Sequence, residues 1–173
     1  MKRILCIFLT VTAVTSFAQT TDLRSVLLKQ LKSTHNEKDW FVPVSVAVDG
    51  LTPEQAMWKD KSGNHSAGQL AYHLWFWNER QLANFKGEKE KAFSGNNDET
   101  FNSFDKNSWK ETVTKLNNVM NELEKLVQNA DEAKLKEWAP IIANISTHNA
   151  YHTGQIIFVR KQQGAWDPDK GVK

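Results

Sequence analysis

The chain has 173 residues, with 22 Lys and Arg against 20 Asp and Glu, so its formal net charge is +2. A chain of this length makes one domain and can bury a proper core. Its basic residues gather in no patch, which argues against nucleic acid as a partner.

The first 18 residues have the pattern of a secretory signal peptide. Lys2 and Arg3 give a positive start, and residues 4–14 form an apolar run too short to span a bilayer as a mature helix. Small residues follow, so we expect cleavage after Ala18. A retained N-terminal anchor is the weaker alternative, because the run is short and no stop-transfer pattern follows it.

Cleavage would leave residues 19–173 as a single exported domain, periplasmic or secreted, with no stable membrane anchor. Its charges would balance at 20 basic and 20 acidic residues, because Lys2 and Arg3 leave with the signal. The only cysteine, Cys6, leaves as well. The mature chain therefore has no disulfide and no thiolate, and its chemistry must use His, carboxylates, hydroxyls or a metal.

The mature chain is predicted to be helical, beginning with a helix capped by Asp22. Its apolar face consists of Leu23, Leu27, Leu31 and Thr34. Pro43 is expected to kink or end this helix, because proline removes a backbone hydrogen bond. The alternating valines of residues 44–48 could form an extended piece, but we expect a final helical stretch that stops at residues 49–50.

Two capping signatures open the next helices. Residues 52–55, Thr-Pro-Glu-Gln, start a helix of one or two turns, and residues 59–65 are expected to be a loop. Ser66 and Gln69 form a second capping box, which opens a long helix through about Phe85. Gly87 is expected to end that helix.

The next segment, residues 87–107, is a polar connection of roughly twenty residues, beyond the usual range of loops. It either carries function or crosses the end of a bundle. Ser108 and Glu111 are expected to cap the third helix. The apolar face of that helix repeats as Val113, Leu116, Met120, Leu123 and Val127.

Residues 131–136 are interpreted as a charged turn, and Pro140 as the first residue of a fourth helix that runs to about Gln163. Residues 166–173 are expected to be an irregular tail. Four amphipathic helices, with one long connection between the second and third, predict an all-α protein: a four-helix bundle with a long crossover.

Three of the five histidines have unusual positions. His35 lies in a polar run and His65 in a loop, so both are expected to be solvated. His148 and His152 interrupt the inward face of the fourth helix, which also carries Ile141, Ile145, Ile156 and Val159. On the second helix, His73 shares a face with Leu70 and Trp77 and is expected to point into the bundle.

Three inward imidazoles indicate a metal site. Residues four apart on a helix can reach one ion, and converging neutral imidazoles satisfy one another poorly without it. A divalent ion on His73, His148 and His152 would keep open coordination positions, as catalytic sites do. The alternative is that His148 and His152 are core or interface histidines bonded to the backbone, with His73 unrelated.

Two segments resemble a known family. Residues 146–156, Ser-Thr-His-Asn-Ala-Tyr-His-Thr-Gly-Gln-Ile, resemble the fourth-helix signature of the DinB/YfiT-like superfamily of metalloenzymes. Residues 66–74, with the serine cap and His73, match its second-helix pattern. Residues 51–55 and Trp58 are similar to its usual link between the first two helices. The resemblance covers essentially the whole mature chain.

The resemblance implies a four-helix bundle with a long crossover and a divalent ion, nickel or zinc, held by His73, His148 and His152. It also implies a homodimer, and thiol-dependent transferase or isomerase activity among the family's members. The export signal is a departure from those members. Their thiol-dependent activities belong to the cytoplasm, where low-molecular-weight thiols are abundant, so an exported protein would not have the same supply of thiol.

Other residues are candidates for the surroundings of the site. Gln155 could bond a ligand imidazole or a metal-bound water. Tyr72 and Tyr151 each precede a ligand histidine and are expected to pack on its flank. Glu79 could act as a base if the fold brings it to the site, and is otherwise a surface charge.

The aromatic run Trp75, Phe76 and Trp77 cannot all face one core, so at least one ring is expected at a pocket mouth or a dimer interface.

The sequence thus favours an exported metal-dependent enzyme that acts on a small molecule by hydrolysis or group transfer. The ion would activate water, a thiol or a hydroxyl, and no residue is identified as the general base. Two alternatives remain open: a module that binds a metal or ligand without turnover, and a structural bundle that dimerises through its aromatic residues.

Overall fold

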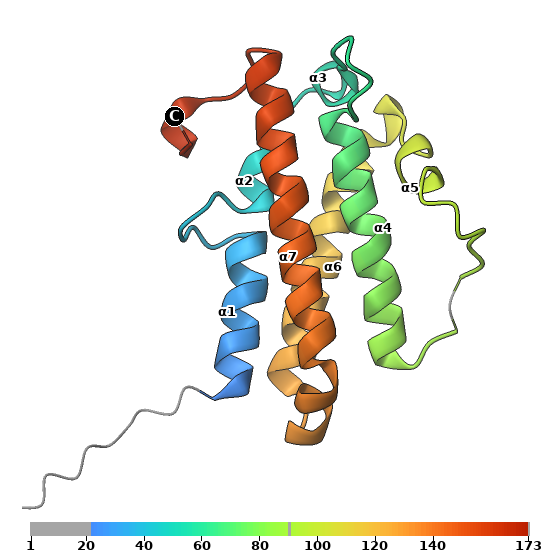
Figure 1. Ribbon diagram of the computed structural model, residues 1–173, viewed down its shortest axis with the longest axis vertical. Helices are drawn as coiled ribbons and strands as arrows, with labels where there is room; N and C mark the ends of the chain where they lie inside the picture. Colours follow the sequence, from blue (N-terminus) through green and yellow to red (C-terminus); the bar gives the residue numbers. More distant parts are fainter. Residues whose placement is uncertain (1–21, 90, 173) are drawn as a thin grey trace, which may run out of the picture.

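The computed structural model describes residues 22–89 and 91–172, which form α-helices and 3₁₀ helices and contain no strand (Figure 1). The predicted all-α class is confirmed. The proposed signal peptide and its cleavage point lie outside the described residues. Among the helices described, none combines the length and the apolar character that crossing a membrane requires.

The helices differ greatly in length, and the four longest supply most of the buried hydrophobic residues. In chain order they are α1 Leu23–His35, α2 Val44–Val48, α3 Pro53–Met57, α4 Ala67–Lys86, α5 Glu99–Asn102, η1 Lys106–Ser108, α6 Trp109–Asn129, α7 Glu132–Gln162 and η2 Pro168–Lys170. Helices α6 and α7 each pack against both α1 and α4 (Figure 1). The short α5 packs on α4, and α2 packs on α7.

Several helix ends follow the predicted signals. The Asp22 side chain accepts a hydrogen bond from the Ser25 amide at the start of α1. Thr52 and Ser66 both form complete capping boxes at α3 and α4. Helix α4 ends at Gly87, whose φ of 69° lies in the left-handed region that favours glycine. These ends are set by neighbouring residues alone, which is why the pattern predicts them.

Helix α1 ends earlier than expected. It stops at His35, and Pro43 instead precedes α2 as its N-cap residue. The intervening residues 36–41 are polar apart from two aromatics and are exposed, so continuing the helix would have buried no apolar face. The expected helical stretch before residues 49–50 is confirmed as α2.

The expectation that Pro140 starts the last helix is wrong. Helix α7 begins at Glu132, where Asp131 caps it by accepting from the Lys134 amide, and Pro140 lies inside the helix. Pro140 and Lys136 are exposed, so the Lys136 carbonyl that loses its helical partner faces water. The buried residues Leu135, Trp138 and Ile142 hold this part of α7 in the core.

Helix α6 starts without the expected capping box. Ser108 has helical backbone angles at the end of η1, and its hydroxyl donates to the Asp105 carbonyl instead of capping α6. An N-cap residue needs an extended backbone, which the preceding 3₁₀ turn prevents. The apolar repeat is confirmed: Leu116, Met120, Leu123 and Val127 are buried, and Val113 is partly buried against them.

The long connection after α4 returns to the core. Thr100, Phe101 and Phe104 are buried, although residues 91–99 are mostly exposed. Gly68 in the first turn of α4 permits this packing, because a Cβ there would lie 2.3 Å from the Phe104 ring. The connection thereby places α5 beside α4, on the side that carries His73.

Candidate metal centre

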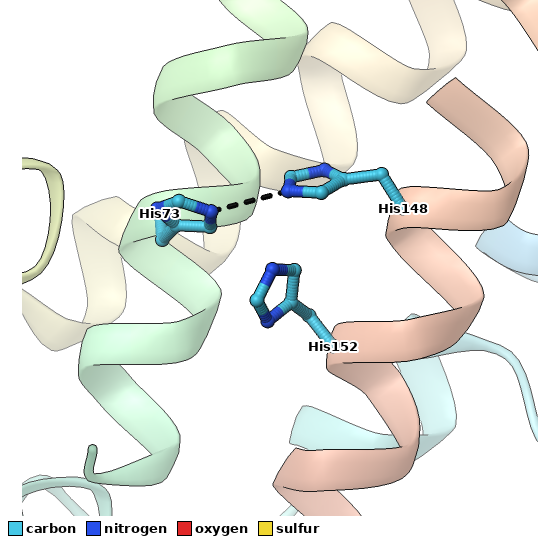
Figure 2. Close-up of side chains that lie close together, drawn as sticks. All are labelled: His73, His148 and His152. Atoms are coloured by element: carbon cyan, nitrogen blue, oxygen red, sulfur yellow. Dashed lines mark hydrogen bonds between the residues drawn. The ribbon is translucent and has the colours of Figure 1, made fainter. Parts of the chain in front are cut away.

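Three histidines from two helices meet between α4 and α7 (Figure 2). His73 comes from the middle of α4, and His148 and His152 lie one turn apart on α7. The Nε2 atoms of His73 and His148 are 3.1 Å apart, and one nitrogen from each ring lies within 4.8 Å of the others. The predicted convergence of the three rings is therefore observed.

The protonation of His73 follows from its neighbour. Its Nδ1 lies 2.6 Å from the Thr100 hydroxyl oxygen, and that hydroxyl donates its hydrogen to the Asn97 carbonyl at 2.6 Å. The Thr100 oxygen must therefore accept from Nδ1–H of His73. Neutral His73 then carries no hydrogen on Nε2, the nitrogen that faces His148.

His152 is oriented in a similar way by α7 itself. Its Nδ1 lies 2.6 Å from Oε1 of Gln155, an acceptor, so Nδ1 carries the hydrogen and Nε2 keeps its lone pair. The Gln155 amide in turn donates to the Tyr151 hydroxyl at 3.2 Å. The expected contact between Gln155 and one of the three imidazoles is thus present.

Burial keeps the three imidazoles neutral. Desolvation, together with the positive charges that His152 and His148 would carry, lowers the pKa of His73 from 6.5 to about 3. Burial and His152 lower the pKa of His148 to about 4, and burial also lowers the pKa of His152. At neutral pH each neutral ring therefore keeps one nitrogen lone pair that a cation can use, and for His73 and His152 it lies on Nε2.

The donor set fits a divalent transition metal. Two imidazole nitrogens that each lie about 2.05 Å from one ion are roughly 2.9 to 3.4 Å apart, depending on the coordination angle. The separation of 3.1 Å between His73 and His148 falls in that range. Neutral imidazoles suit zinc, nickel, copper and iron, whereas calcium and magnesium prefer oxygen ligands.

An aromatic stack supports His73 from the other side. The Phe101 ring lies 4.0 Å from the His73 ring at an angle of 7°, and the His65 ring lies 3.8 Å from Phe101 on its opposite face. The expectation that His65 is solvated is therefore wrong: it is half-buried, and burial lowers its pKa. The loop that carries His65 folds back onto α5, which the local sequence does not indicate.

Thr100 and Phe101 were not predicted from the sequence to lie at the site. Both are buried beside His73, and they belong to the polar connection whose fold was not predicted. The only local signal was a pair of apolar residues, Phe101 and Phe104, three apart in a polar segment, as on one side of a short helix.

A cavity of about 690 Å³ opens beside the three histidines. Trp77 lines it, which confirms that one ring of the aromatic run lies at a pocket. Asn78 also lines it and exchanges hydrogen bonds of 2.8 and 3.4 Å with Asn149, a buried amide pair that joins α4 to α7. Ile141 was expected in the core, but it is 41% exposed at the cavity, and Ile142 is buried instead.

Other candidate residues lie away from the cavity. Glu79 lies 3.7 Å from Lys91 and lines a separate depression with Lys86 and Lys115, so it does not reach the histidines as a base. Tyr72 packs edge-on against Trp75, likewise outside the cavity. Tyr151 flanks His152 at a ring distance of 4.9 Å and is 62% exposed.

His35 does not fit the expectation of a solvated side chain. It is only 2% exposed, between α1 and α6. Its Nδ1 lies 2.6 Å from the Glu124 carboxylate, and its Nε2 lies 3.3 Å from the Asn117 amide oxygen. The polar residues around His35 gave no sign of this burial, because both of its partners, Glu124 and Asn117, come from α6, far along the chain.

The described part of the chain is thus all-helical, and three histidines between α4 and α7 could hold one metal ion. Comparison with protein families identifies the group: the DinB superfamily matches residues 44–157, a range that includes all three histidines. The chain belongs to the DinB superfamily. Neither the curated proteins nor the solved structures contain a match.

Proposed function

We propose that the protein is an exported metal-dependent enzyme that binds one divalent ion, nickel or zinc, through His73, His148 and His152. The main support for this proposal is that three imidazoles lie close together with no carboxylate in the group. Two of them, His73 and His152, donate Nδ1–H to Thr100 and Gln155, away from the other rings. The Nε2 atoms of His73 and His152 thus keep lone pairs in the space that the three rings share, and a cation there would be stabilised by them.

The proposed reaction is hydrolysis or group transfer on a small molecule. A bound ion would supply Lewis acidity and lower the pKa of a water, thiol or hydroxyl beside it. The chain's own residues orient the ligands: Thr100 fixes His73, and Gln155 fixes His152. The adjacent cavity of about 690 Å³ has the size of a small-molecule site.

The wider architecture and location belong to the same proposal. The packing of α6 and α7 against both α1 and α4 supports a four-helix bundle with residues 87–107 as its crossover. Residues 19–173 would form that domain, periplasmic or secreted after cleavage near Ala18 and assembled as a homodimer. N-terminal sequencing of secreted protein and its mass in solution test these points.

Metal content tests the central point. Protein purified without a histidine tag should contain close to one equivalent of nickel or zinc, and added metal should raise its melting temperature. A His148→Ala variant should lose both properties. If the wild type contains no stoichiometric metal and melts at the same temperature with and without added nickel or zinc, the metal site is refuted.

A second function, metal or ligand binding without turnover, is supported by one observation. Apart from the histidines, no acid or base side chain lines the cavity in the described part of the chain. Screening with thiol-transfer and hydrolase substrates separates the two functions. Turnover that persists in a His152→Ala variant would contradict the proposed mechanism.

A further inference from the structure

The cavity beside the histidines has a chemically simple lining. Among the described residues, no Asp, Glu, Lys or Arg side chain contributes to it. Charged groups instead line the separate depression around Glu79 and Lys115.

Besides Asn78, three further carboxamides line the cavity. Gln81, Asn97 and Asn144 come from three different segments and all border the cavity. Within residues 22–89 and 91–172, none of their side chains makes a hydrogen bond, whereas Asn78 is held by Asn149 and the Leu74 carbonyl. These three amides therefore keep both their donors and their acceptors for a ligand.

The rest of the lining is apolar. Trp77 and Phe101 contribute aromatic surface from α4 and α5, and Ile141 and Ile145 contribute aliphatic surface from α7. Four apolar side chains close to three amides can accept a flat apolar group while hydrogen bonding to its polar substituents.

Charged substrates need a different lining. Phosphates and carboxylates are usually bound by Arg or Lys, and ammonium groups by carboxylates. A charged tail entering this cavity would lose water without gaining an opposite charge. Only the group that reaches the three histidines would meet a positive charge, and that charge would be the bound ion's.

We propose that the cavity binds an uncharged small molecule with a flat apolar body and neutral hydrogen-bonding substituents, whose one metal-binding group lies against His73, His148 and His152. This inference rests on the proposed metal site and adds the class of substrate to it.

This inference can be tested with a set of probe molecules that share one metal-binding group and one ring and differ in the charge of the substituent at the far end of the ring. Benzohydroxamic acid carries a metal-binding head and a flat ring, and its para position can hold a carboxamide, a carboxylate or an aminomethyl group. Isothermal titration calorimetry of the zinc-loaded protein would give the dissociation constant of each. We expect the carboxamide to bind at least about 10-fold more tightly than either charged probe.

A matched pair of variants locates the effect. Asn144→Asp puts a carboxylate at the cavity, and Asn118→Asp makes the same change at an exposed position of α6 that borders the other depression. Asn144→Asp should strengthen binding of the aminomethyl probe relative to the carboxamide by about 10-fold. Asn118→Asp should leave the order of the three probes as in the wild type.

The outcomes separate the two proposals. Wild-type protein that takes up no zinc contradicts the proposed function, and this inference with it. Zinc-loaded protein that binds all three probes equally, prefers a charged one, or binds none refutes the neutral cavity and leaves the metal site standing. An unchanged order of the probes in zinc-loaded Asn144→Asp protein also refutes it.

Discussion

Two clusters of side chains in this protein contain histidines and differ in the partners of those histidines. His35 lies between α1 and α6 with an oxygen partner for each ring nitrogen, from Glu124 and from Asn117. His73, His148 and His152 lie between α4 and α7 with their inner nitrogens facing one another. The first cluster is complete as it stands, whereas the second gains from a cation.

The comparison shows that burial alone does not identify a metal site. His35 is 2% exposed and His73 is 3% exposed, so accessibility does not distinguish them. Their hydrogen-bond partners distinguish them. The Glu124 carboxylate is a negatively charged acceptor for an imidazole N–H of His35, whereas a neighbouring neutral imidazole brings no charge to His73. The clusters should therefore respond differently to mutation, metal and pH.

The largest expected difference is in metal affinity. His152→Ala should lower the affinity for zinc by more than about 100-fold, since loss of an outer hydrogen-bond partner alone costs roughly 10- to 100-fold. His35→Ala should leave the affinity unchanged. Competition with a chromophoric chelator would measure both, and equal affinities for the two variants would contradict the distinction between the clusters.

The next effect is on stability without metal. His35→Ala should lower the free energy of unfolding by about 2 kcal/mol, because Glu124 loses its partner while mostly buried. His148→Ala should cost about 1 kcal/mol or less, because His148 is half-buried and no carboxylate depends on it. Urea unfolding in the presence of a chelator tests this order, and a larger loss in His148→Ala would reverse it.

A smaller effect is expected at the outer partner of His73. Thr100→Val removes the hydroxyl that accepts from Nδ1–H and should weaken zinc binding by about 10-fold. Thr114→Val makes the same change on the exposed surface of α6 and serves as the control. Wild-type affinity in Thr100→Val would mean that the hydroxyl does not orient the ligand.

A further effect, which acts only in the metal-free protein, concerns acid. In the metal-free protein the pKa of His73 and that of His148 lie below 6.5, so the unfolded chain binds more protons than the folded chain below that pH. The stability these groups contribute is present above pH 6.5 and is lost as the pH falls toward the folded-state pKa values, about 4 for His148 and about 3 for His73. Urea unfolding at about pH 7 and about pH 5 should show the loss, and a His73→Leu/His148→Leu variant should show less of it. An equal loss in that variant would assign the effect to other groups.

Much of the fold was predictable because its signals are local. Asp22, Thr52, Ser66 and Gly87 each act on the backbone within a few residues, and each sets the helix end that the sequence predicted. Ser108 had the same kind of signal, but the 3₁₀ turn before it gave it the wrong backbone angles. Pro140 was misplaced because buried neighbours on α7 override its cost in the helix.

The sequence by itself determined that the chain is helical and that His73, His148 and His152 face inward, because helical spacing fixes which residues share a face. Tertiary structure decided which histidines have partners. Glu124 reaches His35 because α6 packs against α1, and Thr100 and Phe101 reach His73 because α5 packs against α4. Periodicity describes one helix at a time, so it cannot reveal the partner that a second helix brings.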